Sequence, residues 1–127
     1  MSEEKGIIKE DFSEFFQKKI YRFTLDLIKF LEDLKYDATV KVIRDQLLRS
    51  GTSIGANQME AQSASTRKDF TNFYHYSLKS ANESKFWLYL LRDTEKADPQ
   101  KVEALLSELG EISKILGKSI INLKKQK

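Results

Sequence analysis

Apolar side chains recur every three or four residues along most of the chain, which is the spacing of helices that bury one face. The first such segment covers residues 12–34, where phenylalanine and leucine alternate with charged residues. Asp11, followed three residues later by Glu14, has the pattern of a capping box and predicts the start of this helix. Residues 1–10 are mostly polar and aperiodic, so we expect a flexible arm there.

In the second segment, residues 38–63, the periodicity of apolar residues and the helix propensity lead to different predictions. Asp37 is a suitable N-cap, but Gly51 and Gly55 each cost about 1 kcal/mol against alanine in a helix interior. Propensity alone predicts a loop here. The seven-residue spacing of apolar residues predicts an unbroken helix, and we favour it: Val40, Leu47, Ile54 and Ala61. Gly51 and Gly55 then share a face and would let a neighbouring helix come close.

Two more helices are predicted, over residues 66–94 and 99–123. Ser65 or Thr66 is placed to begin the third, and Asp98 followed by Pro99 is a typical start for the fourth. The core-facing positions of the third helix are small in the middle and large at both ends, like those of the second. The two small middles could therefore face each other, as interdigitated packing requires.

Four long helices with short connections predict an all-α, antiparallel, up-down-up-down four-helix bundle. At 127 residues the chain fits one domain, which we assign to residues 11–124, leaving 125–127 as a basic tail. One proline and five glycines favour long helices over a sandwich of short strands.

Cysteine is absent, which excludes disulfides, thiol catalysis and cysteine metal sites. It also fits a reducing compartment. The chain begins without a signal-peptide pattern and has no uncharged apolar run of membrane-spanning length. We therefore expect a cytoplasmic protein with no membrane partner.

Catalytic chemistry finds little support. His75 is the only histidine, and Asn72 stands where a Glu-x-x-His iron motif needs its glutamate. A packing or surface role for His75 is the simpler interpretation. We expect no enzyme, no catalytic residue, no metal and no cofactor, and we infer no small-molecule substrate.

The net charge of +3 is unevenly distributed and includes a candidate nucleic-acid surface. Basic residues precede the third helix and end the fourth, two places that share one pole of an antiparallel bundle: Arg67, Lys68, Lys124, Lys125 and Lys127. Such a cluster favours an anionic partner. The alternative is a solvated surface with a frayed lysine tail.

Four polar residues fall at or beside core-facing positions: Arg49, Asn57, Glu60 and Glu83. Charged side chains are rarely buried unless they are paired. Either all four are exposed, or they form a polar cluster between the second and third helices with at least one buried cross-helix pair. A cluster of that kind fixes register more than it adds stability.

Aromatic residues surround the third helix on more than one side, and the first helix is apolar beyond its main stripe. A helix apolar over so wide an arc has more than one surface to pack against. Self-association explains this pattern, because monomers rarely leave a large apolar patch uncovered. A broad core and base stacking are the alternatives.

Two segments resemble the motifs of a known family. Gln46–Ala61 is similar to the second-helix motif, and Lys68–Phe70 with Ser77–Leu88 to the third-helix motif, of bacterial four-helix-bundle proteins. These are also called 23S ribosomal RNA intervening-sequence proteins. The resemblance covers about residues 16–122. Many members close the first motif with Ile-Ala-Glu-Gly, where this chain has Gln58-Met-Glu-Ala61.

The resemblance implies a ring-shaped homopentamer of up-down-up-down bundles. Some members are encoded within inserted segments of ribosomal RNA genes, and a related branch assists the reverse transcriptase of diversity-generating retroelements. RNA or a reverse transcriptase is therefore an expected partner. Two hypotheses follow: an oligomer that binds nucleic acid through basic surface, or a protein-interaction scaffold that does not.

Overall fold

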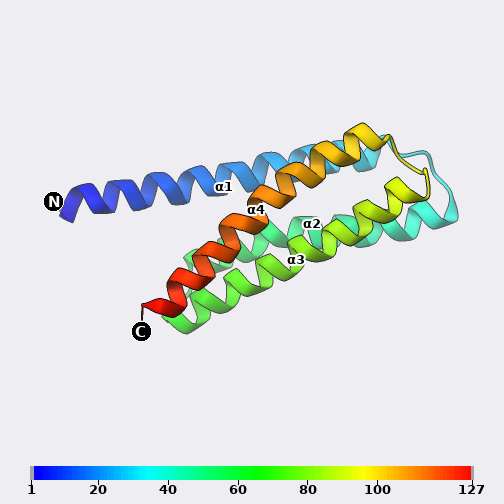
Figure 1. The fold of residues 1–127 in the computed structure, drawn as a ribbon. Coiled ribbons are helices and arrows are strands. Elements are labelled where there is room, and N and C mark those ends of the chain that lie inside the picture. Colours follow the sequence, from blue (N-terminus) through cyan, green and yellow to red (C-terminus); the bar gives the residue numbers. More distant parts are fainter. Residues whose placement is uncertain (1, 127) are drawn as a thin grey trace.

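The computed structural model describes residues 2–126, with side chains from residue 12 onward. Over this part the chain forms four helices joined by short loops, shown in Figure 1: α1 (Ser2–Glu32), α2 (Ala38–Gln62), α3 (Arg67–Asp93) and α4 (Pro99–Lys125). α1 and α3 each lie beside α2 and α4, so consecutive helices are antiparallel neighbours around one core. The predicted all-α four-helix bundle is confirmed.

The starts of α2, α3 and α4 are fixed by side-chain caps. Asp37 accepts a hydrogen bond from the backbone N–H of Val40 at 2.7 Å. The other two caps accept in the same way, Thr66 from Asp69 at 3.1 Å and Asp98 from Gln100 at 2.9 Å. Each cap satisfies an N–H that has no partner inside the helix. These three helices therefore begin where their caps predict.

The start of α1 differs from the prediction. The helix begins at Ser2 and passes through Asp11, so Asp11 is no cap and residues 2–10 are not a separate arm. Figure 1 shows this end of α1 extending away from the other helices.

The C-terminal end of the bundle also differs from the expected boundary. α4 continues to Lys125, and Gln126 is its C-cap, so the residues predicted as a tail are partly helical. Lys127 lies outside the described residues.

The core consists of one apolar stripe from each helix. α4 buries six apolar side chains: Val102, Leu105, Leu109, Ile112, Leu116 and Ile120. α1 contributes Phe16, Ile20, Phe23 and Leu27. Phe12, which continues that stripe in the sequence, is 52% exposed and lines a surface hollow with Phe70 and Tyr74 of α3.

The middles of α2 and α3 meet through small polar side chains. The hydroxyls of Ser50 and Ser84 are 2.8 Å apart, and Ser77 Oγ donates to the backbone carbonyl of Ile54 at 2.8 Å. All three serines are fully buried. A serine reaches the backbone of a neighbouring helix only when the two helices are close, so the predicted meeting of the two small middles is observed.

Two glycines bring α2 close to α1. α2 is continuous through Gly51 and Gly55, as the seven-residue spacing predicted. A methyl group at Gly51 would overlap Leu27 Cδ2, and one at Gly55 would lie 3.3 Å from Ile20 Cγ2. Both contacts come from α1, so the neighbour that the glycines admit is α1.

Substitution of Gly51 by alanine should therefore destabilise the bundle, although alanine is the better helix former. We expect a loss of about 1–3 kcal/mol in unfolding free energy, because the added methyl displaces Leu27. Urea denaturation monitored by circular dichroism measures this loss.

The matched control is Gly117→Ala in α4. An added methyl there has no atom within 4 Å, so the variant should gain up to about 1 kcal/mol from helix propensity alone. Equal stabilisation by both substitutions would contradict the close contact at Gly51.

Candidate nucleic-acid interface

The antiparallel topology brings the start of α3 and the end of α4 to the same end of the bundle (Figure 1). Arg67, Lys68 and Lys124 line one surface hollow of about 420 Å³ there. Its wall is completed by His75, Thr71 and Asn72 of α3, Leu123 of α4 and Gln126, the C-cap of α4. We call Arg67, Lys68, Lys124 and Lys125 the basic pole.

Each helix positions part of the basic pole. Arg67 is the first residue of α3, and its guanidinium donates to the side-chain oxygen of Gln126 beyond the end of α4. Lys124 and Lys125 occupy the last turn of α4, where positive charge is favoured by the helix dipole. Lys125 is exposed but lies outside the hollow's wall. The predicted fifth member, Lys127, is beyond the described residues.

The surroundings of the pole are predominantly positive. Residues 114–126 contain four lysines and no acid, and Asp69 is the only acid between residues 63 and 72. The side-chain amide of Asn72 lines the same hollow, whereas the Thr71 hydroxyl already donates to the carbonyl of Arg67 at 2.9 Å. Cations combined with neutral donors are the groups that hold phosphate oxygens in nucleic-acid complexes.

The predicted polar cluster is only partly assembled. Arg49 forms an ion pair with Glu83 across the α2–α3 contact, and Glu83 also accepts from Trp87 Nε1 at 3.0 Å. The two charged side chains are 55% and 37% exposed, however, so they are not the buried pair that was expected. Exposed pairs contribute little to stability.

The remaining two members of that cluster stand apart from it. Asn57 donates to the carbonyl of Ser53 in its own helix at 2.8 Å, and Glu60 is exposed. The buried cross-helix polar contact is made by Ser50 and Ser84 instead. The prediction named mainly long charged side chains. It failed because the small middles of the two helices leave room only for serine.

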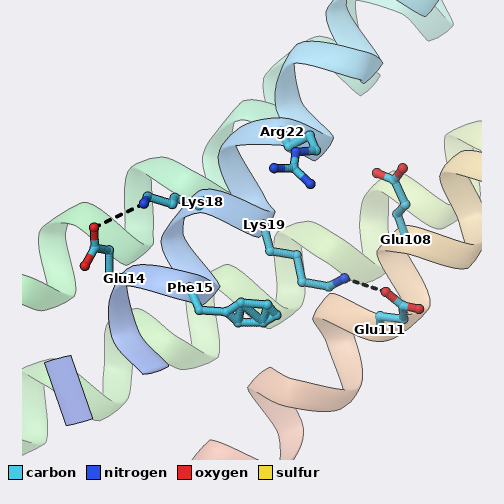
Figure 2. A pocket seen from close by; sticks show the side chains of 7 residues that line it. All are labelled: Glu14, Phe15, Lys18, Lys19, Arg22, Glu108 and Glu111. Carbon is cyan, nitrogen blue, oxygen red and sulfur yellow. Dashed lines mark hydrogen bonds and ion pairs between the residues drawn. The ribbon is translucent and has the colours of Figure 1, made fainter. Parts of the chain in front are cut away.

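A second hollow, between α1 and α4, was not predicted. Figure 2 shows the seven residues that line this groove of about 590 Å³: Glu14, Phe15, Lys18, Lys19, Arg22, Glu108 and Glu111. Lys19 reaches across to Glu111 at 2.5 Å, and Lys18 pairs with Glu14 at 3.2 Å within α1. The groove could be found from sequence only with the register of α1 against α4 already known.

The groove is electrically balanced, with three cations and three carboxylates in its wall. Burial raises the pKa of Glu108 above its ordinary value, and the charge of Asp26 adds to the shift, while Lys19 opposes it. A balanced groove has no net attraction for an anion. Among residues 12–126, moreover, no three acidic or histidine side chains are grouped to hold a metal. The basic pole is therefore the stronger candidate for an anionic partner.

The chain matches the family described as 23S rRNA-intervening sequence protein over residues 14–118. It belongs to this family. A crystal structure of a protein of unknown function from the S23 ribosomal protein family of Bacteroides thetaiotaomicron has a TM-score of 0.79 to this chain. The two are 36% identical, over 85% of this chain and 96% of that one. No curated protein matches.

The residues matched to the family include only part of the basic pole. Arg67 and Lys68 lie inside the matched residues, whereas Lys124 and Lys125 lie beyond them. Within residues 2–126, no helix of this family member has an apolar stretch that could cross a membrane. Membership of the family therefore agrees with the bundle fold. The choice of ligand depends on the surface of this chain.

The raised pKa of Glu108 has a consequence for stability. The folded state holds the Glu108 proton more tightly than the unfolded chain, so wild-type stability falls as the pH rises from the ordinary glutamate pKa through the raised folded value. Glu108→Gln removes this loss. We expect the variant to melt at a higher temperature than wild type at neutral pH.

The difference should disappear near pH 3, where Glu108 is protonated in both states. Thermal melts at the two pH values measure it. Glu60→Gln, at an exposed glutamate of α2, is the control and should change neither melt. A stabilisation by Glu108→Gln that persists at low pH would refute the electrostatic explanation.

Proposed function

We propose that this intervening-sequence family member is a non-enzymatic protein that binds RNA through the basic pole. The observation that carries the proposal is the convergence of Arg67, Lys68 and Lys124 on one hollow. These side chains come from segments more than fifty residues apart in the sequence. The absence of acid from residues 114–126 extends the positive surface along α4.

Recognition at this pole would be directed at phosphate. Lysine is a point charge, and the arginine fork can contact two phosphate oxygens at once. The exposed aromatic side chains Tyr76 and Phe86 do not line the hollow, and His75 supplies the aromatic ring in its wall, so phosphate contacts dominate the chemistry of the pole. Binding should therefore be weakly selective for sequence and steeply dependent on salt.

Self-association belongs to the same proposal. α1 and α3 expose large apolar side chains, among them Phe15, Tyr76 and Phe86, and a second subunit would remove such groups from water. The family resemblance makes a homopentamer the expected assembly. A ring repeats the basic pole once per subunit and raises a weak attraction through avidity.

A second candidate function is a protein-interaction scaffold with no role in nucleic-acid binding. The observation that favours it is the exposed ring of Phe86, which meets the partly buried ring of Trp87 edge to face with centroids 5.0 Å apart. Aromatic residues are enriched at protein interfaces. A reverse transcriptase is the partner that the resemblance suggests for this alternative.

The RNA proposal predicts binding that depends on four cations. Neutralising the pole with R67Q, K68Q, K124Q and K125Q should weaken binding at low salt by at least about tenfold, and should flatten the salt dependence because fewer counterions are released. Fluorescence anisotropy with a structured and a single-stranded RNA, at low and physiological salt, measures both effects.

The matched control neutralises four exposed lysines outside the pole: K29Q, K35Q, K79Q and K101Q. Both variants lose the same charge, so a difference between them reports position. No binding by wild type at low salt, or equal losses in the two variants, would reject RNA binding at the pole and favour the scaffold.

Native mass spectrometry at micromolar concentration should detect an oligomer, with the pentamer as the expected species. Phe86→Ser should shift the population toward smaller species, because it removes exposed apolar surface from α3. Val42→Ser, at an equally exposed apolar position of α2, is the control. A wild-type monomer would show that the exposed aromatics serve another purpose.

A further inference from the structure

A third hollow, of about 210 Å³, opens between α1 and α2 beside the contact of Gly55 with Ile20. None of its nine lining residues is charged, in a chain where charged residues make up 32% of the sequence. Tyr21 and Met59 form its rim and are 66% and 64% exposed. The hollow is thus a neutral, largely apolar site on a charged protein.

Gln58 is the unusual member of the wall. It occupies a core-facing position of α2 and is only 2% exposed. Its amide nitrogen Nε2 is buried, and no group among the described residues accepts a hydrogen bond from it. A buried donor without an acceptor destabilises the fold, whereas leucine at this position would not. The amide is therefore better explained by a ligand than by packing.

Three other polar side chains of the wall are already engaged, and the fourth, the phenol of Tyr21, lies at the exposed rim. Thr24 Oγ1 donates to the carbonyl of Ile20 at 2.8 Å, and Thr52 Oγ1 to that of Leu48 at 2.7 Å. The Gln17 amide donates to Ser13 Oγ at 3.3 Å. These bonds stay within their own helices. The Gln58 amide is left to orient a ligand, and its broad terminal torsion lets the NH₂ group turn toward the hollow.

Volume and charge together limit the class of ligand. A cavity of about 150 Å³ accepts benzene, and sites for drug-sized molecules begin at about 300 Å³. The present hollow lies between these values and fits one ring with a short substituent. A charged ligand would find no opposite charge in the wall and would be costly to bury. An oxygen acceptor, in contrast, would satisfy Gln58 Nε2.

We propose that the hollow between α1 and α2 binds a small, neutral ring compound that carries a carbonyl oxygen, with Gln58 as the hydrogen-bond donor. The bond would pair a donor that the fold leaves unsatisfied. Ile20 and Met59 would contact the ring. This site is separate from the basic pole, and its occupancy does not depend on whether RNA is bound.

Acetophenone is a suitable probe, and ethylbenzene, which has a similar shape but no carbonyl, is its matched control. We expect acetophenone at millimolar concentration to shift the NMR signals of the Gly55 backbone amide and the Gln58 side-chain amide. Since one hydrogen bond contributes about 1 kcal/mol, acetophenone should bind about fivefold more tightly than ethylbenzene.

Two variants test separately the hydrogen-bond donor of Gln58 and the volume of the hollow. Gln58→Leu should raise the melting temperature, because it removes the unpaired amide, and should abolish the preference for acetophenone. Gly55→Val should fill the hollow beside Ile20 and prevent both compounds from binding. Gln62→Leu, one turn along α2 and exposed, should leave the preference unchanged.

The proposal is overturned if acetophenone leaves the Gly55 and Gln58 signals unmoved, or if wild type binds both compounds equally. It is also overturned if Gln58→Leu keeps the preference. An assembly in which a neighbouring subunit covers the hollow would give the first of these results. The RNA titration is read separately, because none of these variants changes the basic pole.

Discussion

The close contact between the middles of α2 and α3 is the constraint on which the rest of the bundle depends. Ser77 reaches the backbone of α2, and Ser50 meets Ser84, so the two helices cannot slide without breaking buried hydrogen bonds. Loss of such a bond leaves a polar group unsatisfied in the core. The contact therefore fixes register as well as distance, a role that charged side chains could not fill at this separation.

The position of the other two helices follows from this pair. Gly51 turns its bare backbone toward α1, where Leu27 occupies the space that a side chain would need. α4 packs a regular stripe of leucine and isoleucine against α3 and α1. α1 is held only along part of its length, and both unpredicted hollows lie at its edges, one beside α2 and one beside α4. The candidate binding surfaces therefore lie along α1 and at one end of the bundle, away from the tight contact between α2 and α3.

The sequence predicts most of the fold because its strongest signals are local and periodic. Seven-residue spacing outweighs the glycines of α2, and Asp37, Thr66 and Asp98 mark three helix starts. The predicted start of α1 at Asp11 was wrong, because the capping pattern there is equally compatible with a helix interior. A capping pattern favours a helix start but does not by itself require one.

The candidate sites divide in the same way. Topology alone brings Arg67 and Lys124 together, so the basic pole could be predicted. The neutral hollow at Gln58 could not, because its shape depends on how Ile20 and Tyr21 pack against Gly55. A glutamine at a core-facing position was the available signal, and it was overlooked among the charged residues of the same helix.

The composition of α2 also has a consequence for the order of folding. The segment from Ser50 to Asn57 consists mainly of glycine, serine, threonine and asparagine, which are weak helix formers in isolation. Its buried polar partners belong to α3. During synthesis α1 and α2 leave the ribosome first, so the central turns of α2 emerge before the serines that complete their buried hydrogen bonds.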